Sequence, residues 1–138
     1  MHVYLDSSVL LRVIMGEPAA LPEFRAIELA VSSELLRVEC LRTIDRLRMR
    51  GMLNDAEVSR RSVGVLDAIQ RVELVPITAP VLDRASQPFP TTLGTLDAIH
   101  LSSALLWQQS EGPPLTLLTH DTELATAARA LGFTVIGS

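Results

Sequence analysis

Four acidic side chains stand where they could do chemistry together. Asp6 and Asp121 each follow a short apolar run, whereas Glu39 and Asp97 lie in helix-like segments. If these carboxylates converge they need a cation, because two unit charges ~4 Å apart repel by about 4 kcal/mol at an effective dielectric of about 20. Mg²⁺ and Mn²⁺ prefer oxygen ligands and retain reactive waters. Convergence would therefore indicate a metal-dependent nuclease, in which an activated water attacks a phosphodiester.

The segments that must position these acids alternate between strand and helix. Short apolar runs predict strands at 3–5, 29–31, 73–77, 115–119 and 133–136. The segments between them predict helices at 7–15, 22–28, about 33–50, 54–71, 78–86, 95–109 and 121–131, with breaks at 16–18, 87–94 and 112–114. The expected N-caps include Ser7 or Ser8, Ser32 or Ser33, Asn54 or Asp55, and Thr95.

This alternation predicts the fold class. Apolar strands separated by amphipathic helices indicate an α/β protein, a three-layer α/β/α sandwich around a mainly parallel sheet of about five strands. A chain of 138 residues is long enough for one domain, so we expect residues 1–138 to form a single one.

Two of the acids are placed by strand ends. In doubly wound sheets, ligands bind beyond the carboxyl ends of the strands. Asp6 ends the first predicted strand, and Asp121 comes two residues after Thr119 at the end of the fourth. One rim of the sheet could therefore present both carboxylates.

The other two acids are placed by helices. Asp97 lies about two residues into a predicted helix, where the helix dipole favours a negative charge, so a purely structural acid would also be found there. Glu39 borders the apolar stripe of the long helix formed by Leu36, Cys40, Ile44 and Leu47. Glu34 lies in the first turn, where an acid is expected for the dipole alone. We therefore predict Glu39, not Glu34, as the ligand.

Several other side chains have both a functional and a structural interpretation. The hydroxyls of Ser7, Ser8 and Thr119 could hold a carboxylate in place, although capping or strand-end bonding also explains them. Arg42, with Arg46 and Arg50 on the same helix face, could contact RNA phosphates, or could pair with Asp45 and other acids nearby. We expect His100 to pack within its helix and Trp107 to serve in packing or at a dimer contact. His120 adjoins Asp121 and could face substrate, although a structural role at a strand end is the favoured interpretation.

Composition restricts the cellular setting. The net charge is −4, but setting aside four metal-binding acids would leave a balanced surface, so charge alone does not exclude a nucleic-acid partner. Cys40 is the only cysteine, which leaves no intrachain disulfide and suggests a reducing compartment. The chain has neither the pattern of a signal peptide nor an apolar run of membrane-spanning length, so we expect a cytoplasmic protein.

With these residues assembled, the chain resembles the PIN-domain proteins, specifically the VapC-type ribonuclease toxins of toxin–antitoxin pairs. The resemblance spans nearly the whole chain and is carried by Tyr4-Leu5-Asp6-Ser7-Ser8, the segment from Ser32 to Glu39, Thr95-Leu96-Asp97-Ala98-Ile99-His100, and Leu118-Thr119-His120-Asp121. Two features depart from the family pattern: Gly94 stands where a basic residue is frequent, and segment 108–114 is longer than usual.

The resemblance implies a PIN-like fold and an endoribonuclease that inhibits translation and growth. It implies Mg²⁺ or Mn²⁺ as cofactor, with Asp6, Glu39, Asp97 and Asp121 as the acidic ligands. It also implies an RNA substrate, a homodimer, and a cognate antitoxin that wraps the toxin and blocks the site.

Two alternatives carry less weight. Haloacid dehalogenase-type enzymes and receiver domains also place an aspartate after the first strand, but they usually need a lysine, and this chain has none; Ser8 also replaces the second aspartate of the dehalogenase signature. A non-catalytic PIN-like module for binding RNA or protein is the other alternative. The complete acidic set argues against it, because clustered charges are costly without a metal.

Overall fold

The apolar runs form a five-stranded parallel sheet. The computed structural model describes residues 1–17 and 21–138. The strands are β1 (His2–Leu5), β2 (Leu29–Ser33), β3 (Val72–Val75), β4 (Thr116–Leu118) and β5 (Thr134–Ile136). Every neighbouring pair is parallel, in the order β3-β2-β1-β4-β5. Parallel strands need crossover connections, which the intervening helices supply.

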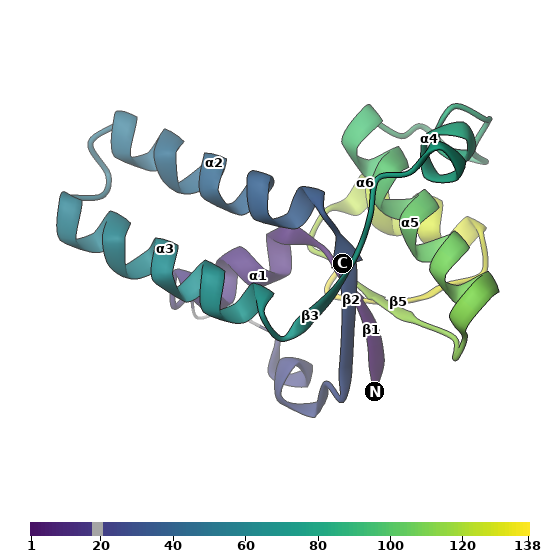
Figure 1. Cartoon of the computed structure of the whole chain (residues 1–138), viewed down its shortest axis with the longest axis horizontal. Coiled ribbons are helices and arrows are strands. Elements are labelled where there is room, and N and C mark those ends of the chain that lie inside the picture. The colour runs from purple at the N-terminus through teal and green to yellow at the C-terminus, as the bar shows by residue number, and fades with distance from the viewer. Residues whose placement is uncertain (18–20) are drawn as a thin grey trace.

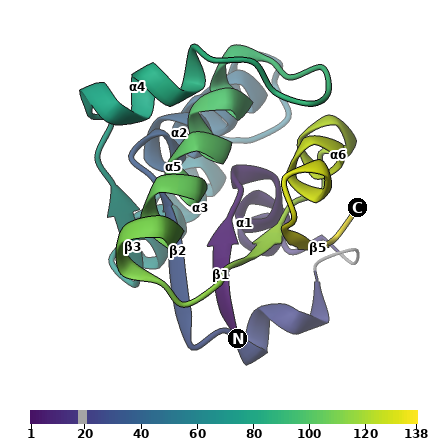
Figure 2. The ribbon, with the colours of Figure 1, turned by 90° about the vertical axis from the view of Figure 1, so that its right-hand side faces the viewer.

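The helices cover both faces of this sheet. They are α1 (Ser7–Ile14), α2 (Leu35–Met49), α3 (Asp55–Ile69), α4 (Ala79–Ala85), α5 (Thr95–Glu111) and α6 (Thr122–Ala130), with a 3₁₀ turn, η1, at Pro22–Ala26. Helices α1, α2 and α3 lie on one side and α4, α5 and α6 on the other (Figure 1). Figure 2 shows α5 in front of the sheet, with α2 and α3 behind it. The predicted three-layer α/β/α sandwich with a parallel five-stranded sheet is confirmed.

Each helical layer encloses its own apolar core. Alternate residues of a strand point to opposite faces, and β1 follows this rule. Tyr4 packs with Leu101 and Leu117 under α5 and α6, whereas Val3 and Leu5 pack against α1 and α2. The central strand is therefore buried on both sides, as a strand without polar alternation predicts.

Several predicted boundaries differ from the structure. The second strand continues through Ser32 and Ser33, because the Ser32 hydroxyl is satisfied by the Leu5 carbonyl at 2.7 Å. Helix α2 therefore begins at Leu35, although the Ser33 hydroxyl still accepts the Leu35 amide at 3.1 Å. The helix predicted at 22–28 is only the short 3₁₀ turn. Pro18, a predicted stop for the first helix, lies outside the described residues.

The strand order places the first two acids side by side. From β1 the chain passes to β2 and β3 on one side, then returns to β4 and β5 on the other, so the order reverses between β1 and β4. Such a reversal opens a crevice at the carboxyl ends of the strands. The Asp6 amide donates to the Leu118 carbonyl at 3.0 Å, which joins the two strand ends there.

Among the described residues, no helix is long and apolar enough to cross a membrane.

Candidate active site

Asp6 is a buried carboxylate held through one of its two oxygens. It is only 4% exposed, and its Oδ2 accepts hydrogen bonds from Ser8 Oγ at 2.6 Å and Thr119 Oγ1 at 2.8 Å. Asp6 occupies the N-cap position of α1 without capping it. Within residues 1–17 and 21–138, no hydrogen bond engages its Oδ1. Ser8, rather than Ser7, is therefore the serine that holds Asp6.

Thr119 links Asp6 to Asp121. While its hydroxyl donates to Asp6, it also accepts the Asp121 amide at 2.9 Å, and Ser8 Oγ accepts the His120 amide at 2.9 Å. Asp121 caps α6, because its Oδ1 accepts the Leu124 amide at 2.9 Å. The Ser8 and Thr119 hydroxyls thus join the turn after β4 to the turn after β1. Asp121 itself is exposed.

Glu39 reaches the site from the first turns of α2. Its Oε1 accepts a hydrogen bond from Nε2 of His100, and Nδ1 of the same imidazole lies 2.7 Å from the Tyr4 hydroxyl. Burial is the main reason that the pKa of the Tyr4 phenol is raised well above its usual range. Glu34 has a different partner: its Oε2 accepts the Ile77 amide at 3.2 Å beyond the end of β3. The structure thus places Glu39, and not Glu34, beside His100.

Asp97 lies in the first turn of α5, where the charges of the other three acids affect its pKa. Gly94, not the predicted Thr95, occupies the N-cap position of this helix. Burial raises the pKa of the Asp97 carboxyl to about 6, and the negative charges of Asp121, Asp6 and Glu39 add to the rise, against an opposing effect of His100. Asp97 therefore senses all three carboxylates, which is the electrostatic signature of a converging cluster.

The same negative charges favour the protonated, cationic form of the His100 imidazole. Burial by itself lowers the pKa of this imidazole. The hydrogen bond and charge of Glu39, with the charges of Asp6 and Asp97, outweigh that effect and raise the pKa overall. The excess of negative charge around Glu39 therefore stabilises an imidazole that is cationic or donates a proton to the carboxylate.

Three of the four acids are turned toward protein partners. In the part of the chain that the structure describes, no three acidic, histidine or cysteine side chains are arranged so that they could hold a metal ion as they stand. Asp6, Glu39 and Asp121 each direct one oxygen at a hydroxyl, imidazole or amide. Such outer contacts are typical of carboxylates that orient toward a cation through their second oxygen.

Comparison with known proteins identifies the family of this chain. The PIN-domain family model matches residues 3–130, a range that contains all four acids. The chain belongs to the PIN-domain family. It is 36% identical to Ribonuclease VapC46 of Mycobacterium tuberculosis (strain ATCC 25618 / H37Rv), over 97% of this chain and 95% of that protein. It is 31% identical to Ribonuclease VapC47 of M. tuberculosis (strain CDC 1551 / Oshkosh), over 95% of this chain and 93% of that protein.

A cavity of about 300 Å³ adjoins the acidic cluster of this PIN domain at Glu39. Arg42 and Arg46 line it, together with the exposed apolar side chains of Val38 and Leu96. Arg42 donates to Asp45 at 3.0 Å, the pairing that the sequence left open as an alternative. Ser7 also lines this cavity, whereas the neighbouring Ser8 bonds Asp6 instead.

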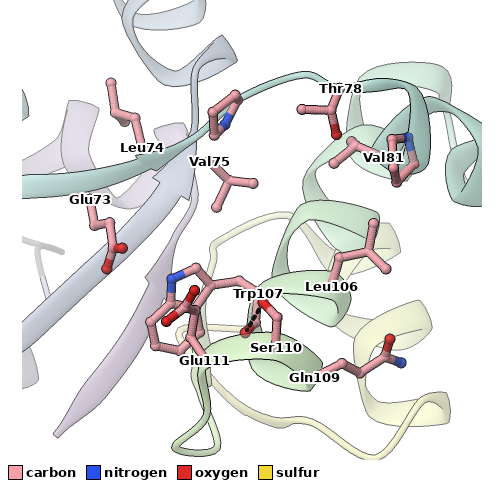
Figure 3. A pocket seen from close by; sticks show the side chains of 12 residues that line it. Glu73, Leu74, Val75, Thr78, Val81, Leu106, Trp107, Gln109, Ser110 and Glu111 are labelled. Carbon is pink, nitrogen blue, oxygen red and sulfur yellow. Dashed lines mark hydrogen bonds between the residues drawn. The ribbon is translucent and has the colours of Figure 1, made fainter.

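A cavity of about 500 Å³ lies elsewhere, beside the edge strand β3 of the PIN sheet. Figure 3 shows Leu74, Val75 and Thr78 on one side of it and Trp107 and Ser110 on the other. None of the four acids lines this cavity. Trp107 is 8% exposed and belongs to the apolar core under α5, so its packing role is confirmed.

Sequence reasoning did not single out the polar contacts of Tyr4 and His100, and it favoured a structural role for His120. His120 is bonded through Nδ1 to the Gly137 carbonyl at 2.9 Å, as its predicted structural role requires. His100 does more than pack, since both of its ring nitrogens have polar partners. The available signal was its spacing: His100 is three residues after Asp97, so both project from one face of the same helix. The part played by Tyr4 had no comparable signal.

Proposed function

We propose that this PIN-domain protein is a metal-dependent endoribonuclease that cleaves RNA phosphodiester bonds. The observation that carries the proposal is the environment of Asp97, where burial and the negative charges of Asp121, Asp6 and Glu39 raise the carboxyl pKa to about 6. Membership of the PIN family and similarity to two ribonucleases of M. tuberculosis support RNA as the substrate. The biological role that fits is the toxin of a toxin–antitoxin pair, which inhibits translation and growth.

Asp6, Glu39, Asp97 and Asp121 would together hold Mg²⁺ or Mn²⁺. The donor set fits these cations, because it consists of carboxylate oxygens, and the imidazole of His100, which contacts Glu39, is already bonded at both nitrogens. When bound, the cation supplies a water of lowered pKa and stabilises negative charge on phosphate oxygens.

The protein's own residues supply position and charge. The Ser8 and Thr119 hydroxyls donate to Asp6 Oδ2, so the carboxylate plane is fixed and Oδ1 is left for a ligand. Thr119 also accepts the Asp121 amide, which couples the two strand-end acids in one arrangement. Burial and the charges of the other three acids disfavour ionised Asp97, and a bound cation would offset both effects.

The cavity beside Glu39 would receive the RNA. Its two arginines, Arg42 and Arg46, can contact phosphates, and Val38 and Leu96 offer apolar surface to an unstacked base. Arg42 must leave Asp45 to do so. That costs little, because exposed ion pairs contribute only about 0–1 kcal/mol. Ser7, which lines the same cavity, is placed to contact the substrate.

The remaining features of the proposal follow the family. Residues 1–138 act as a single PIN-like domain in the cytoplasm, and two copies associate as a homodimer. A cognate antitoxin protein would cover the acidic cluster and keep RNA out until it is removed. The protein without its antitoxin should therefore be toxic to the cell.

RNA cleavage by the purified, antitoxin-free protein tests this proposal. With Mn²⁺ we expect cleavage of structured RNAs, abolished by EDTA and restored by excess Mn²⁺. Asp6→Asn should cut the rate on the order of 10³-fold, because metal charge stabilisation contributes several kcal/mol to the transition state and each 1.36 kcal/mol is about tenfold. Asp67→Asn, which changes an exposed aspartate on α3, is the matched control. Cleavage that survives EDTA, or that Asp6→Asn retains, would refute the proposal.

A further inference from the structure

We propose that Tyr4 and His100 are positioning residues that hold the Glu39 carboxylate through a buried chain of hydrogen bonds, here called the Tyr4–His100–Glu39 chain. The inference rests on the proposed function, because it explains how one of the four acids is aimed. It adds residues that touch neither metal nor RNA.

The chain of contacts is continuous and shielded from water. Tyr4 and His100 are both 0% exposed, and the Glu39 side chain is 19% exposed. The Tyr4 hydroxyl lies 2.7 Å from His100 Nδ1, and the two rings meet edge to face with centroids 5.8 Å apart. His100 Nε2 contacts Glu39 Oε1. No solvent-exposed group intervenes between the core of the sheet and the carboxylate.

The chemistry of the three groups defines the direction of the bonds. A carboxylate oxygen only accepts, so the proton between His100 and Glu39 belongs to Nε2. The Tyr4 hydroxyl donates to Nδ1 of a neutral ring and accepts from Nδ1 of a cationic ring, because a hydroxyl can do both. In both protonation states Nε2 donates to Glu39 while Nδ1 is held by Tyr4, which restricts Glu39 to a single orientation. The arrangement is that of a carboxylate aimed by an outer hydrogen-bond partner.

The topology shows what this chain holds together. Tyr4 is two residues before Asp6 on β1, and His100 is one helical turn after Asp97 on α5. Glu39 comes from α2, which covers the opposite face of the sheet from α5 (Figure 2). The Tyr4–His100–Glu39 chain thus joins one element from each layer of the fold: β1, which leads into Asp6, α5, which carries Asp97, and α2, which carries Glu39. A shift of any one element would break a hydrogen bond.

A purely structural origin is a weaker account of this histidine. Burying an imidazole is costly unless its nitrogens are bonded, and an apolar side chain of similar volume would fill the same core with no such cost. A fully satisfied buried polar network instead specifies one geometry. Because this network leads to the Glu39 carboxylate, its polar residues fix the orientation of Glu39.

Two amides at position 100 separate positioning from packing. In His100→Gln the side-chain amide nitrogen can reach the place of Nε2 and donate to Glu39, whereas in His100→Asn the shorter amide reaches only the place of Nδ1, near Tyr4. We expect kcat for Mn²⁺-dependent RNA cleavage to fall about 10–100-fold in His100→Asn, with KM for RNA little changed, and His100→Gln to recover most of it. His2→Asn, at the other end of β1, is the matched control. Equal losses in the two position-100 variants would overturn the proposal.

A spectroscopic measurement on the metal-free protein keeps the proposal testable without catalysis. The Nε2 proton of His100 should resonate far downfield and exchange slowly in the wild type, and Glu39→Gln, at a partly exposed position, should shift it strongly. If the wild type cleaves no RNA, the proposed function fails. The inference is then decided by two other measurements, the His100 proton resonance and the Mn²⁺ affinities of the position-100 variants. A resonance unchanged by Glu39→Gln, or equal Mn²⁺ affinities in His100→Asn and His100→Gln, would overturn it.

Discussion

Asp97→Asn is expected to abolish RNA cleavage and at the same time to stabilise the metal-free protein. Activity should fall on the order of 10³-fold, because an amide no longer offers a charged ligand to the cation. Stability should rise, because burial and the charges of Asp121, Asp6 and Glu39 disfavour an ionised carboxyl here and raise its pKa from 3.8 to about 6. A residue that destabilises the fold it belongs to is typical of a functional site.

The gain in stability depends on pH in a defined direction. Between about pH 4 and pH 6 the folded protein binds more protons at Asp97 than the unfolded chain does, so the free energy of unfolding falls as pH rises. The full shift corresponds to about 3 kcal/mol, and partial exposure of Asp97 reduces this to about 1–2 kcal/mol. Asp97→Asn removes that cost above pH 6 and has nothing to remove below pH 4.

Urea unfolding in EDTA at pH 7.5 and pH 3.5 measures this effect. We expect Asp97→Asn to be more stable than the wild type at pH 7.5 and equal to it at pH 3.5, with Asp67→Asn unchanged at both. A variant that is less stable than the wild type at pH 7.5 would show that Asp97 has a favourable partner in the metal-free fold, and that the carboxylates do not repel one another there.

Mn²⁺ is expected to stabilise the folded protein strongly at neutral pH. A ligand that binds only the native state adds about 2.7 kcal/mol to the free energy of unfolding at 100 times its dissociation constant. The cation would offset the burial and the neighbouring negative charges that disfavour ionised Asp97 in the metal-free protein. EDTA should return the protein to its metal-free stability, and Asp6→Asn should gain much less from Mn²⁺ than the wild type.

Protons compete with the metal at the same carboxylate. Because the pKa of Asp97 is about 6, Mn²⁺ affinity should be about tenfold weaker at pH 5 than at pH 7.5, which lowers the stabilisation by about 1.4 kcal/mol at a given Mn²⁺ concentration. Paired urea unfolding curves with Mn²⁺ or EDTA at the two pH values provide the measurement. Stabilisation of equal size at both would mean that the ion binds away from Asp97.

The fold followed from the sequence because the strands are apolar without interruption. Runs such as 3–5 and 29–31 have no polar alternation, which is typical of strands buried on both faces. Hydroxyl residues at element boundaries were the source of error. Ser32 belongs to β2 because its side chain bonds the Leu5 carbonyl, yet its sequence context equally suits a helix cap.

The neighbours of each acid could be predicted only where they are close in sequence. The position of Asp6 after β1 and of Asp121 after β4 could be read directly, but the strand order that makes β1 and β4 adjacent could not. The partners of His100 lie 96 and 61 residues away in the chain, so no local pattern indicates the Tyr4–His100–Glu39 chain. Ser8 and Ser7 are likewise indistinguishable until the turn after β1 is seen.

The central claim is that Asp6, Glu39, Asp97 and Asp121 form one cation site, and calorimetric titration of Mn²⁺ tests it most directly. Each acid is replaced singly by its amide, which at Asp121 retains the ability to cap α6. Glu34→Gln, whose native carboxylate bonds the Ile77 amide instead, is the control. The account predicts that all four variants lose at least about tenfold in Mn²⁺ affinity while Glu34→Gln binds as the wild type does. Wild-type affinity in any of the four, or an equal loss in Glu34→Gln, would contradict it.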